Sequence, residues 1–309
     1  MYFDHFLESQ LVTWQTAKNN YDRLKYALYR TVDFDGFKIR IQHNPDRILS
    51  AVAKIDEASL KARACFLCKE HMPAEQQSFD YNPTLDIRVN PYPIFSSHYT
   101  VPAKRHIPQL INEHFEDMLD IARTYPEYTI FYNGPRSGAS APDHFHFQLA
   151  PRHEMPLETD VITCKKETLL ATSNLSVESI ENYIRKNIII HSDSKEALIE
   201  TFLQILSLIG KVLPNDPEPM INLFSWYEAD QWWVVIFPRR QHRPWQFFAE
   251  GEDNILFSPG CVDFAGLIIS PRKIDFDRLD APLLRDLFGQ LTLTDEQFDH
   301  LRSMIQEMN

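Results

Sequence analysis

Two imidazoles and one amide alternate along a short segment near the middle of the chain. The segment reads His144-Phe145-His146-Phe147-Gln148 and follows a loop of small residues that starts at Asn133. Side chains of an extended strand point alternately to its two faces. Both histidines and Gln148 therefore share one face, and the two phenylalanines share the other and favour a hydrophobic core. Imidazole can act as a nucleophile or a metal ligand, and an amide can donate hydrogen bonds, so this face is equipped for chemistry.

A second candidate site is the pair Cys65 and Cys68, which are separated by two residues. At this spacing both thiolates can reach one metal ion in a tight turn. In a reducing compartment such a pair is more often a metal or redox site than a structural disulfide. No βαβ pattern surrounds the pair, so the metal interpretation is favoured over the redox one. A zinc site needs two further ligands, and His71 is a nearby competitor for one of them.

The hydrophobic pattern of the rest of the chain predicts the strands and helices that position these residues. Alternation predicts strands, several of them paired as hairpins, at 37–42, 85–90, 98–102, 128–132, 221–226 and 232–237. Apolar spacing predicts helices at 1–30, 110–125, 180–190, 197–212 and in the tail from residue 275. Hairpins mixed with helices in this order predict an α+β fold around antiparallel sheets.

A faint internal repeat divides the chain. The segment 102–108 and the segment 238–244 both run from a proline at the end of a hairpin arm, through basic residues and a histidine, to a second proline. We interpret this as two copies of one half-domain, although chance similarity of two hairpins explains it about as well. The small-residue loop 258–266 would stand where the first copy has its His-rich strand, so the second copy would complete the pocket.

Composition and charge exclude several classes of protein. The 309 residues are 44% hydrophobic and carry a formal net charge of −12, which disfavours nucleic acid or an anionic membrane as the partner. A local basic pocket for a small anion is still compatible with this charge. Arg47 and Lys54 could hold phosphate, although solvated charges are the simpler explanation of each.

The N-terminal segment gives no sign of export or membrane insertion. Its first ten residues lack a basic region followed by an apolar run, and no stretch of the chain approaches eighteen apolar residues. We therefore expect a cytoplasmic protein with no transmembrane helix.

Taken together, these motifs resemble the histidine-triad (HIT-like) superfamily on its nucleotidyltransferase side. The strand 144–148 resembles the HxHxQ motif of diadenosine tetraphosphate phosphorylases, GDP-galactose phosphorylases and galactose-1-phosphate uridylyltransferases. The hairpin 90–95 is similar to the superfamily's hairpin, and the loop 138–140 and the segments 238–240 and 263–266 are similar to the phosphorylases. Uridylyltransferases usually have prolines where Phe145 and Phe147 stand, so the resemblance favours phosphorylases.

The resemblance implies a reaction and roles for named residues. The second histidine of the motif, His146, would attack the α-phosphate and carry the nucleotide as a covalent adduct. Gln148 would bind phosphate oxygens but could not protonate a leaving group as a histidine could, so transfer is expected rather than hydrolysis. The loop would hold the phosphates through Asn133, Arg136, Ser137, Gly138 and Ser140.

The resemblance also implies a structural zinc ion. Its ligands would be Cys65, Cys68, His106 and His144, as in zinc-bearing uridylyltransferases, with His71 as the alternative to His106. His144 could instead be a hydrogen-bonded neighbour of the metal ligands.

A HIT-like fold of two half-domains follows, with a catalytic half at 1–175 and a half that completes the pocket at 176–309. The substrate would be a nucleotide-sugar or a dinucleoside polyphosphate, and the acceptor phosphate or a sugar phosphate. The alternatives are a galactose-1-phosphate uridylyltransferase and a zinc-stabilised nucleotide-binding protein without turnover. Uridylyltransferases suggest a homodimer by analogy, but two fused half-domains could do the same job within one chain.

Overall fold

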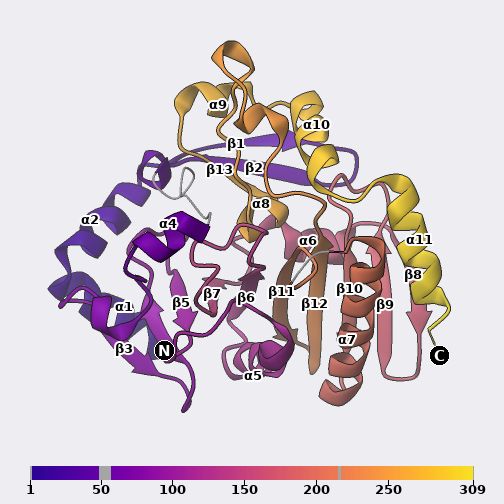
Figure 1. Ribbon diagram of the computed structural model, residues 1–309, viewed down its shortest axis with the longest axis horizontal. Coiled ribbons are helices and arrows are strands. Elements are labelled where there is room, and N and C mark those ends of the chain that lie inside the picture. Colours follow the sequence, from indigo (N-terminus) through magenta and orange to yellow (C-terminus); the bar gives the residue numbers. More distant parts are fainter. Residues whose placement is uncertain (1, 49–56, 215–216, 309) are drawn as a thin grey trace.

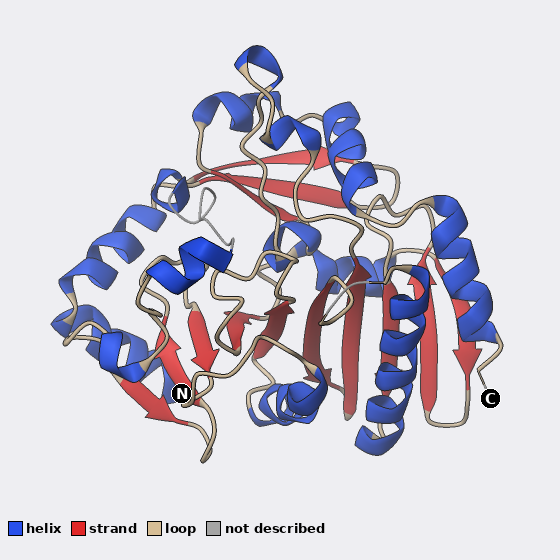
Figure 2. Cartoon of the chain, viewed as in Figure 1, coloured by secondary structure: helices blue, strands red, loops and turns tan. Residues whose placement is uncertain are grey.

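A ten-stranded antiparallel sheet is the centre of the computed structural model, which describes residues 2–48, 57–214 and 217–308. Figure 1 shows the sheet running across the whole molecule, and Figure 2 shows helices on its near side. In spatial order its strands are β3 (Ser78–Asp80), β4 (Asp86–Val89), β5 (Tyr99–Pro102), β7 (His146–Pro151), β6 (Tyr128–Asn133), β11 (Ile221–Glu228), β12 (Gln231–Pro238), β10 (Ile188–Ser192), β9 (Leu175–Ile180) and β8 (Lys166–Ala171).

The sheet consists of two five-stranded halves with the same connectivity. In the first half the spatial order is β3-β4-β5-β7-β6, and in the second it is β8-β9-β10-β12-β11. The halves meet where β6 and β11 pair antiparallel, with Asn133 opposite Asn222. This arrangement confirms the α+β fold with two related halves.

A smaller sheet of three strands joins the two ends of the chain. Its strands are β1 (Leu28–Asp33), β2 (Lys38–His43) and β13 (Leu267–Ser270). The first two form an antiparallel hairpin, and β13 adds to β2 in parallel. In Figure 1 this sheet lies above the ten-stranded one, near α8, α9 and α10.

Helices follow the strands in both halves. The α-helices are α1 (Tyr2–Thr13), α2 (Gln15–Leu24), α4 (Glu57–Ala62), α5 (Phe115–Thr124), α6 (Pro156–Thr163), α7 (Lys195–Val212), α8 (Cys261–Phe264), α9 (Lys273–Arg278), α10 (Ala281–Leu291) and α11 (Asp295–Gln306). Short 3₁₀ turns are η1 (Pro45–Arg47), η2 (Lys69–His71), η3 (Asn112–His114), η4 (Trp245–Phe247) and η5 (Gly251–Asp253). In the part of the chain that is described, none of these helices has the length and apolarity that crossing a membrane requires.

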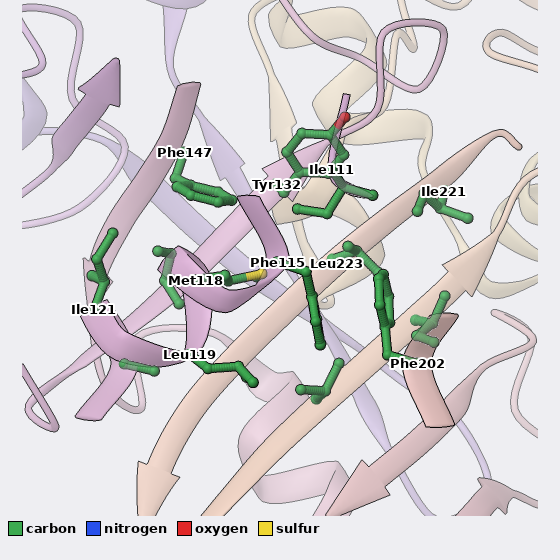
Figure 3. Close-up of a cluster of buried hydrophobic side chains, with 14 of the residues drawn as sticks. Ile111, Phe115, Met118, Leu119, Ile121, Tyr132, Phe147, Phe202, Ile221 and Leu223 are labelled. Carbon is green, nitrogen blue, oxygen red and sulfur yellow. The ribbon is translucent and has the colours of Figure 1, made fainter. Parts of the chain in front are cut away.

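Two hydrophobic cores cover the two faces of the large sheet. The first lies under α5 and α7, and Figure 3 shows Phe147 of β7 pointing into it together with Phe115 and Phe202. The second lies on the opposite face, where α8, α10 and the three-stranded sheet pack against residues such as Phe224 and Val235. Because alternate residues of a strand enter alternate cores, the face of β7 that carries His146 is the face of the second core.

Most of the expected elements are present, and two expectations were wrong. The helix expected at 1–30 is two helices, and from Leu28 the chain is a strand because Leu28–Asp33 pairs with β2. The helix expected at 180–190 is the end of β9, a turn and β10. Ile188, Ile189 and Ile190 are β-branched residues, which favour strands, and short apolar runs do not distinguish strand from helix.

The register of the internal repeat was also wrong. Connectivity pairs β5 with β10 and β7 with β12, whereas the proline-to-proline similarity pairs the ends of β5 and β12. The counterpart of the His-rich strand in the second half is therefore β12, not the loop 258–266.

Candidate active site

Strand β7 presents His146 at its first residue. Its side chain is only 3% exposed, while the neighbouring Phe145 and Phe147 are fully buried in the first core. The His146 Nδ1–H donates to the backbone carbonyl of His144 at 2.8 Å, so the lone pair of the ring is on Nε2. Burial, the largest cause, lowers the pKa of His146 to about 4, so the ring is neutral. A neutral imidazole with a free Nε2 has the form that a nucleophile needs.

Gln109 fixes the backbone of His146. Its Oε1 accepts from the His146 N–H at 2.7 Å, and its Nε2 donates to the carbonyls of His146 and Asn133 at 2.9 and 3.0 Å. Regular pairing of β6 with β7 ends at Phe131 opposite Gln148. Gln109 is thus inserted where the two strands separate, and it satisfies the backbone groups that the ladder leaves unpaired.

Gln148 lies two residues further along the same face of β7. Its Oε1 is 2.8 Å from Nε2 of His98, a fully buried histidine at the start of β5. Burial, followed by the charge of Arg47, lowers the pKa of His98 to about 3. The two side chains therefore form a neutral imidazole–amide pair beside His146.

A cavity of about 740 Å³ lies over this face, which is a size suited to a nucleotide. His146, Gln148 and the loop residues Gly138 and Ser140 line it from the first half of the chain. From the second half it is lined by residues that include His242, Arg243, Ser258, Gly260 and Asp263. Residues of both halves therefore line the cavity.

Two glycines allow the loops of the two halves to meet. Gly138 has a φ of +100°, and a Cβ added there would lie 2.8 Å from the Cα of Gly260. A Cβ on Gly260 would lie 2.9 Å from Oδ1 of Asn133. Larger residues at either position would push the loops apart and change this end of the cavity.

The structure separates the five loop residues expected to hold phosphate. Asn133, Gly138 and Ser140 line the cavity, whereas Arg136 and Ser137 are not among the lining residues. Arg136 is exposed, and the Ser137 N–H already donates to Gly134 at 2.9 Å. Oδ1 of Asn133 is also engaged, because it accepts from the N–H of Cys261 and from the amide of Asn222.

Arg47 and Arg243 are among the arginines that line the cavity. Arg47 donates to the Tyr92 carbonyl at 2.8 Å, and Arg243 donates through Nε to the Ser258 hydroxyl at 2.8 Å. Burial lowers the pKa of Arg47 to about 10 and also lowers the pKa of Arg243, yet both remain cationic near neutral pH. Cations in a partly buried wall attract phosphate more strongly than solvated ones do. Lys54, the other basic residue considered from the sequence, lies outside the described residues.

Cys65, Cys68, His106 and His144 converge beside the His-rich strand. Their ligand atoms all lie within 4.8 Å of one another. Sγ of Cys65 is 3.3 Å from Nδ1 of His144, and Sγ of Cys68 is 3.2 Å from Nδ1 of His106. A tetrahedral zinc ion with ordinary Zn–S and Zn–N bonds sets such sulfur–nitrogen edges at about 3.5 Å, so the group fits a zinc ion.

The groups around this cluster support metal binding. The Nε2–H of His144 donates to the Ala103 carbonyl at 2.8 Å, which leaves Nδ1 bare for a metal. Nε2 of His106 is 3.6 Å from a carboxylate oxygen of Asp143. His71 lies apart from the four, with its Nδ1 3.0 Å from the Cys65 carbonyl, although it forms a second, more exposed group with Cys68 and Glu70. The geometry favours His106 as the fourth ligand.

Sequence reasoning missed Gln109, His98 and Arg243. Gln109 and His98 carry no local motif, and their partners lie 37 and 50 residues away along the chain. Arg243 lies within the repeated segment 238–244, so the repeat was a usable signal for it.

Two family models match the two halves of the chain. Residues 6–151 match a model described as a domain of unknown function, DUF4922, and residues 157–309 match one described as GDPGP1-like, C-terminal domain. No curated protein matches the sequence.

Solved structures of yeast Ap4A phosphorylase Apa2 share the fold. One of these structures aligns with a TM-score of 0.61 at 13% identity, covering 91% of this chain and 97% of that chain. The complex with AMP aligns at 0.57 and 16% identity, covering 92% and 97%. The complex with Ap4A aligns at 0.56 and 14% identity, covering 91% and 97%. These matches confirm the fold expected from the resemblance to HIT-like nucleotidyltransferases.

Proposed function

From a phosphorylase fold with a GDPGP1-like C-terminal half as the premise, we propose that this protein is a nucleotidyltransferase of the phosphorylase type. It acts on a nucleotide-sugar or a dinucleoside polyphosphate through a nucleotidyl-His146 intermediate. The observation that carries the proposal is the His146 ring, whose Nδ1–H is held by its own backbone while the ring lines the cavity between the halves. The related fold in yeast is that of an Ap4A phosphorylase solved with AMP and with Ap4A.

In the first step Nε2 of His146 attacks the α-phosphorus. A nitrogen–phosphorus bond forms, and the bond to the bridging oxygen breaks with its electron pair on the leaving phosphate. Positive charge develops on the ring, and the Nδ1–H bond to the His144 carbonyl becomes stronger as it develops. In the second step an oxygen of the acceptor phosphate attacks the same phosphorus, and the nitrogen–phosphorus bond returns its electrons to His146.

Groups from both halves of the chain can stabilise the negative charge of the phosphates. Arg47 and Arg243 supply positive charge in the cavity wall, and backbone N–H groups of the loop at Gly138 and Ser140 are close to the same space. Gln148 donates hydrogen bonds but has no proton to give to a leaving group, so the adduct persists until an acceptor arrives.

Cys65, Cys68, His106 and His144 would hold a zinc ion in a structural role. A closed site of four protein ligands leaves no position for substrate. Ligation of His144 would hold that residue in place, and its carbonyl accepts from the Nδ1–H of the nucleophilic ring two residues later.

The experiment is intact-mass spectrometry of the protein after incubation with Ap4A, a GDP-hexose or UDP-glucose. We expect a mass increase of one nucleoside monophosphate with one of these substrates, mapped to His146, and its disappearance when phosphate or a sugar phosphate is added. An adduct with UDP-glucose alone would favour the uridylyltransferase alternative. Tight nucleotide binding with no adduct and no product would contradict the proposal and leave a nucleotide-binding protein.

A further inference from the structure

We propose that His98 is a positioning residue that fixes the amide orientation of Gln148, so that the Gln148 NH₂ group faces the phosphates in the cavity. This inference rests on the proposed function and deepens it. It concerns how one side chain of that site acquires its donor role.

The contact is short and buried. Nε2 of His98 lies 2.8 Å from Oε1 of Gln148, and the His98 side chain has no exposure to solvent. In the antiparallel pairing of β5 with β7, Thr100 is opposite Gln148, and His98 lies two residues before Thr100, so the His98 ring reaches Gln148 diagonally. The other ring nitrogen, Nδ1, accepts from the backbone N–H of Ile94 at 3.3 Å.

These two contacts determine which nitrogen of His98 carries the proton. A backbone N–H can only donate, so Nδ1 must accept and must be unprotonated. The proton of the neutral ring is therefore on Nε2, and Nε2–H must donate to Gln148. Burial and the neighbouring charge of Arg47 keep the ring neutral, which preserves this arrangement near neutral pH.

The protonation of His98 settles an ambiguity in Gln148. The two ends of an amide have nearly the same shape, and only the hydrogen-bond network decides which end is oxygen. Because His98 donates, the carbonyl oxygen of Gln148 must face it, and the NH₂ group must point elsewhere. Gln148 lines the cavity, so the reversed amide would present its oxygen to anionic phosphate and repel it.

The N-terminal helices hold His98 in this position. The hydroxyl of Tyr21, from α2, donates to the His98 carbonyl at 3.1 Å and accepts from the His98 N–H at 3.2 Å. The ring of Phe131 is stacked on the His98 ring with centroids 6.2 Å apart, and the ring of Phe95 meets it edge-on at 5.4 Å. An imidazole fixed on its ring faces and its backbone can orient the amide without reorganisation.

Two substitutions of similar size separate the two ring nitrogens. In His98→Asn the side-chain oxygen can still accept from Ile94, but the shorter side chain cannot reach Gln148. In His98→Gln the amide nitrogen reaches the position of Nε2 and can still donate. We expect His98→Asn to lower kcat for transfer about 10- to 100-fold with KM changed less than about 3-fold, and His98→Gln to recover most of the loss.

A double substitution tests whether His98 acts through Gln148. Combined with Gln148→Ala, His98→Asn should add less than about a 2-fold further loss, because the group it orients is gone. Multiplicative losses in the double variant, or no difference between His98→Asn and His98→Gln, would overturn the proposal.

The unmodified protein provides a test that does not depend on variant folding. Nitrogen NMR of the histidine side chains should show His98 with a proton on Nε2 and none on Nδ1. The opposite tautomer would overturn the proposal even if the variants were unstable. The proposed function fails separately, because its failure is an absence of nucleotidyl adduct in the wild-type protein.

Discussion

Strands β7 and β12 hold the same position in the two halves of the sheet, yet their corresponding faces differ completely. Each is the last strand of its half and pairs with the strand before it in the chain. On the face of the second core, β7 carries His146 and Gln148, whereas β12 carries Val235 and Phe237. In β12 this face is packed under the helices of the C-terminal half, and in β7 it lines the cavity. One half uses the face for stability and the other leaves it open for a ligand.

The strand pairs around these two positions also differ. β11 and β12 pair continuously from Glu228 opposite Gln231 to Ile221 opposite Pro238. β6 and β7 stop pairing before His146, and Gln109 occupies the gap. Within the described residues, the Cys/His clusters also belong to the first half. An early end to strand pairing therefore accompanies the open face.

The largest expected effect comes from substituting one residue in β7 and one at the corresponding face of β12. We expect His146→Ala to lower transfer at least about 10³-fold, because the nucleophile is lost, while the free energy of unfolding changes little. Val235→Ala should do the reverse, lowering the free energy of unfolding by about 1–3 kcal/mol with activity kept within about 2-fold. Steady-state kinetics and denaturant unfolding of both variants check this. Equal loss of activity in both would show that β12 contributes to the chemistry.

Metal removal tests the Cys/His cluster, which only the first half carries among the described residues. We expect about one zinc ion per chain, and loss of it in Cys65→Ser or His106→Ala should lower Tm by roughly 10 °C. Elemental analysis and calorimetry measure both quantities. Cys164→Ser, at a half-buried cysteine directly after α6, and His71→Ala should retain the metal. Retention in His106→Ala with loss in His71→Ala would reverse the choice of the fourth ligand.

Glu218, from the second half, accepts hydrogen bonds from residues of the first half, and its contribution to stability depends on pH. Its carboxylate accepts from the Tyr132 hydroxyl and from the Ile111 N–H, at 2.9 and 2.8 Å. Burial raises the pKa of Glu218 to about 7. The folded protein thus holds more protons than the unfolded chain, so this contribution to stability is complete below about pH 4.5 and is lost as pH rises through 7.

Substitution of Glu218 by glutamine should remove this pH dependence. The glutamine amide can donate to Tyr132, whose hydroxyl donates onward to the Gln109 carbonyl, while its oxygen accepts from Ile111. We expect Glu218→Gln to be more stable than wild type by about 3 kcal/mol at pH 8 and to lose that advantage near pH 4. Urea unfolding across this pH range measures it. Glu252→Gln, at an exposed position, should behave as wild type, and a pH-independent difference for Glu218→Gln would contradict this account.

The smallest expected effect concerns the gap between β6 and β7. Gln109→Asn keeps the amide but shortens it by one methylene, so it cannot hold His146 and Asn133 together. We expect adduct formation to slow about 10-fold, measured in a single turnover. Gln246→Asn, a matched change at another buried amide in the C-terminal half, should lower stability without slowing the adduct. An unchanged adduct rate in Gln109→Asn would show that the inserted amide only stabilises the fold.

Local signals in the sequence predicted the fold class and the paired cysteines of the Cys/His cluster, whereas His106 and His144 were expected in that cluster only from the resemblance to zinc-bearing uridylyltransferases. Alternation placed His146 opposite Phe147, and the spacing of Cys65 and Cys68 indicated a metal turn. Which loop residues line the cavity was not predictable: the N–H of Ser137 donates to the Gly134 carbonyl within the loop itself, and Arg136 is exposed.

The residues that orient the site were missed for a related reason. Gln109 acts through three hydrogen bonds to the backbones of β6 and β7, and His98 acts through one to Gln148; such bonds leave no periodic pattern. The sequence indicated that the chain contains two related halves, but it did not show which strand of one half corresponds to which strand of the other. Proline ends a hairpin arm in β5 and in β12 alike, so the local similarity aligned strands that hold different positions.

The parallel pairing of β13 with β2 bears on how this chain could be divided. A cut between residues 151 and 157 would give one fragment with an exposed edge on β2 and another with a solitary β13. Neither fragment would be an autonomous module, and each would offer the edge that the other lacks. Co-expressed fragments should therefore reassociate by strand complementation, in the manner of a split reporter. The two halves are therefore expected to depend on each other for folding, and truncation should not recover either as a stable unit.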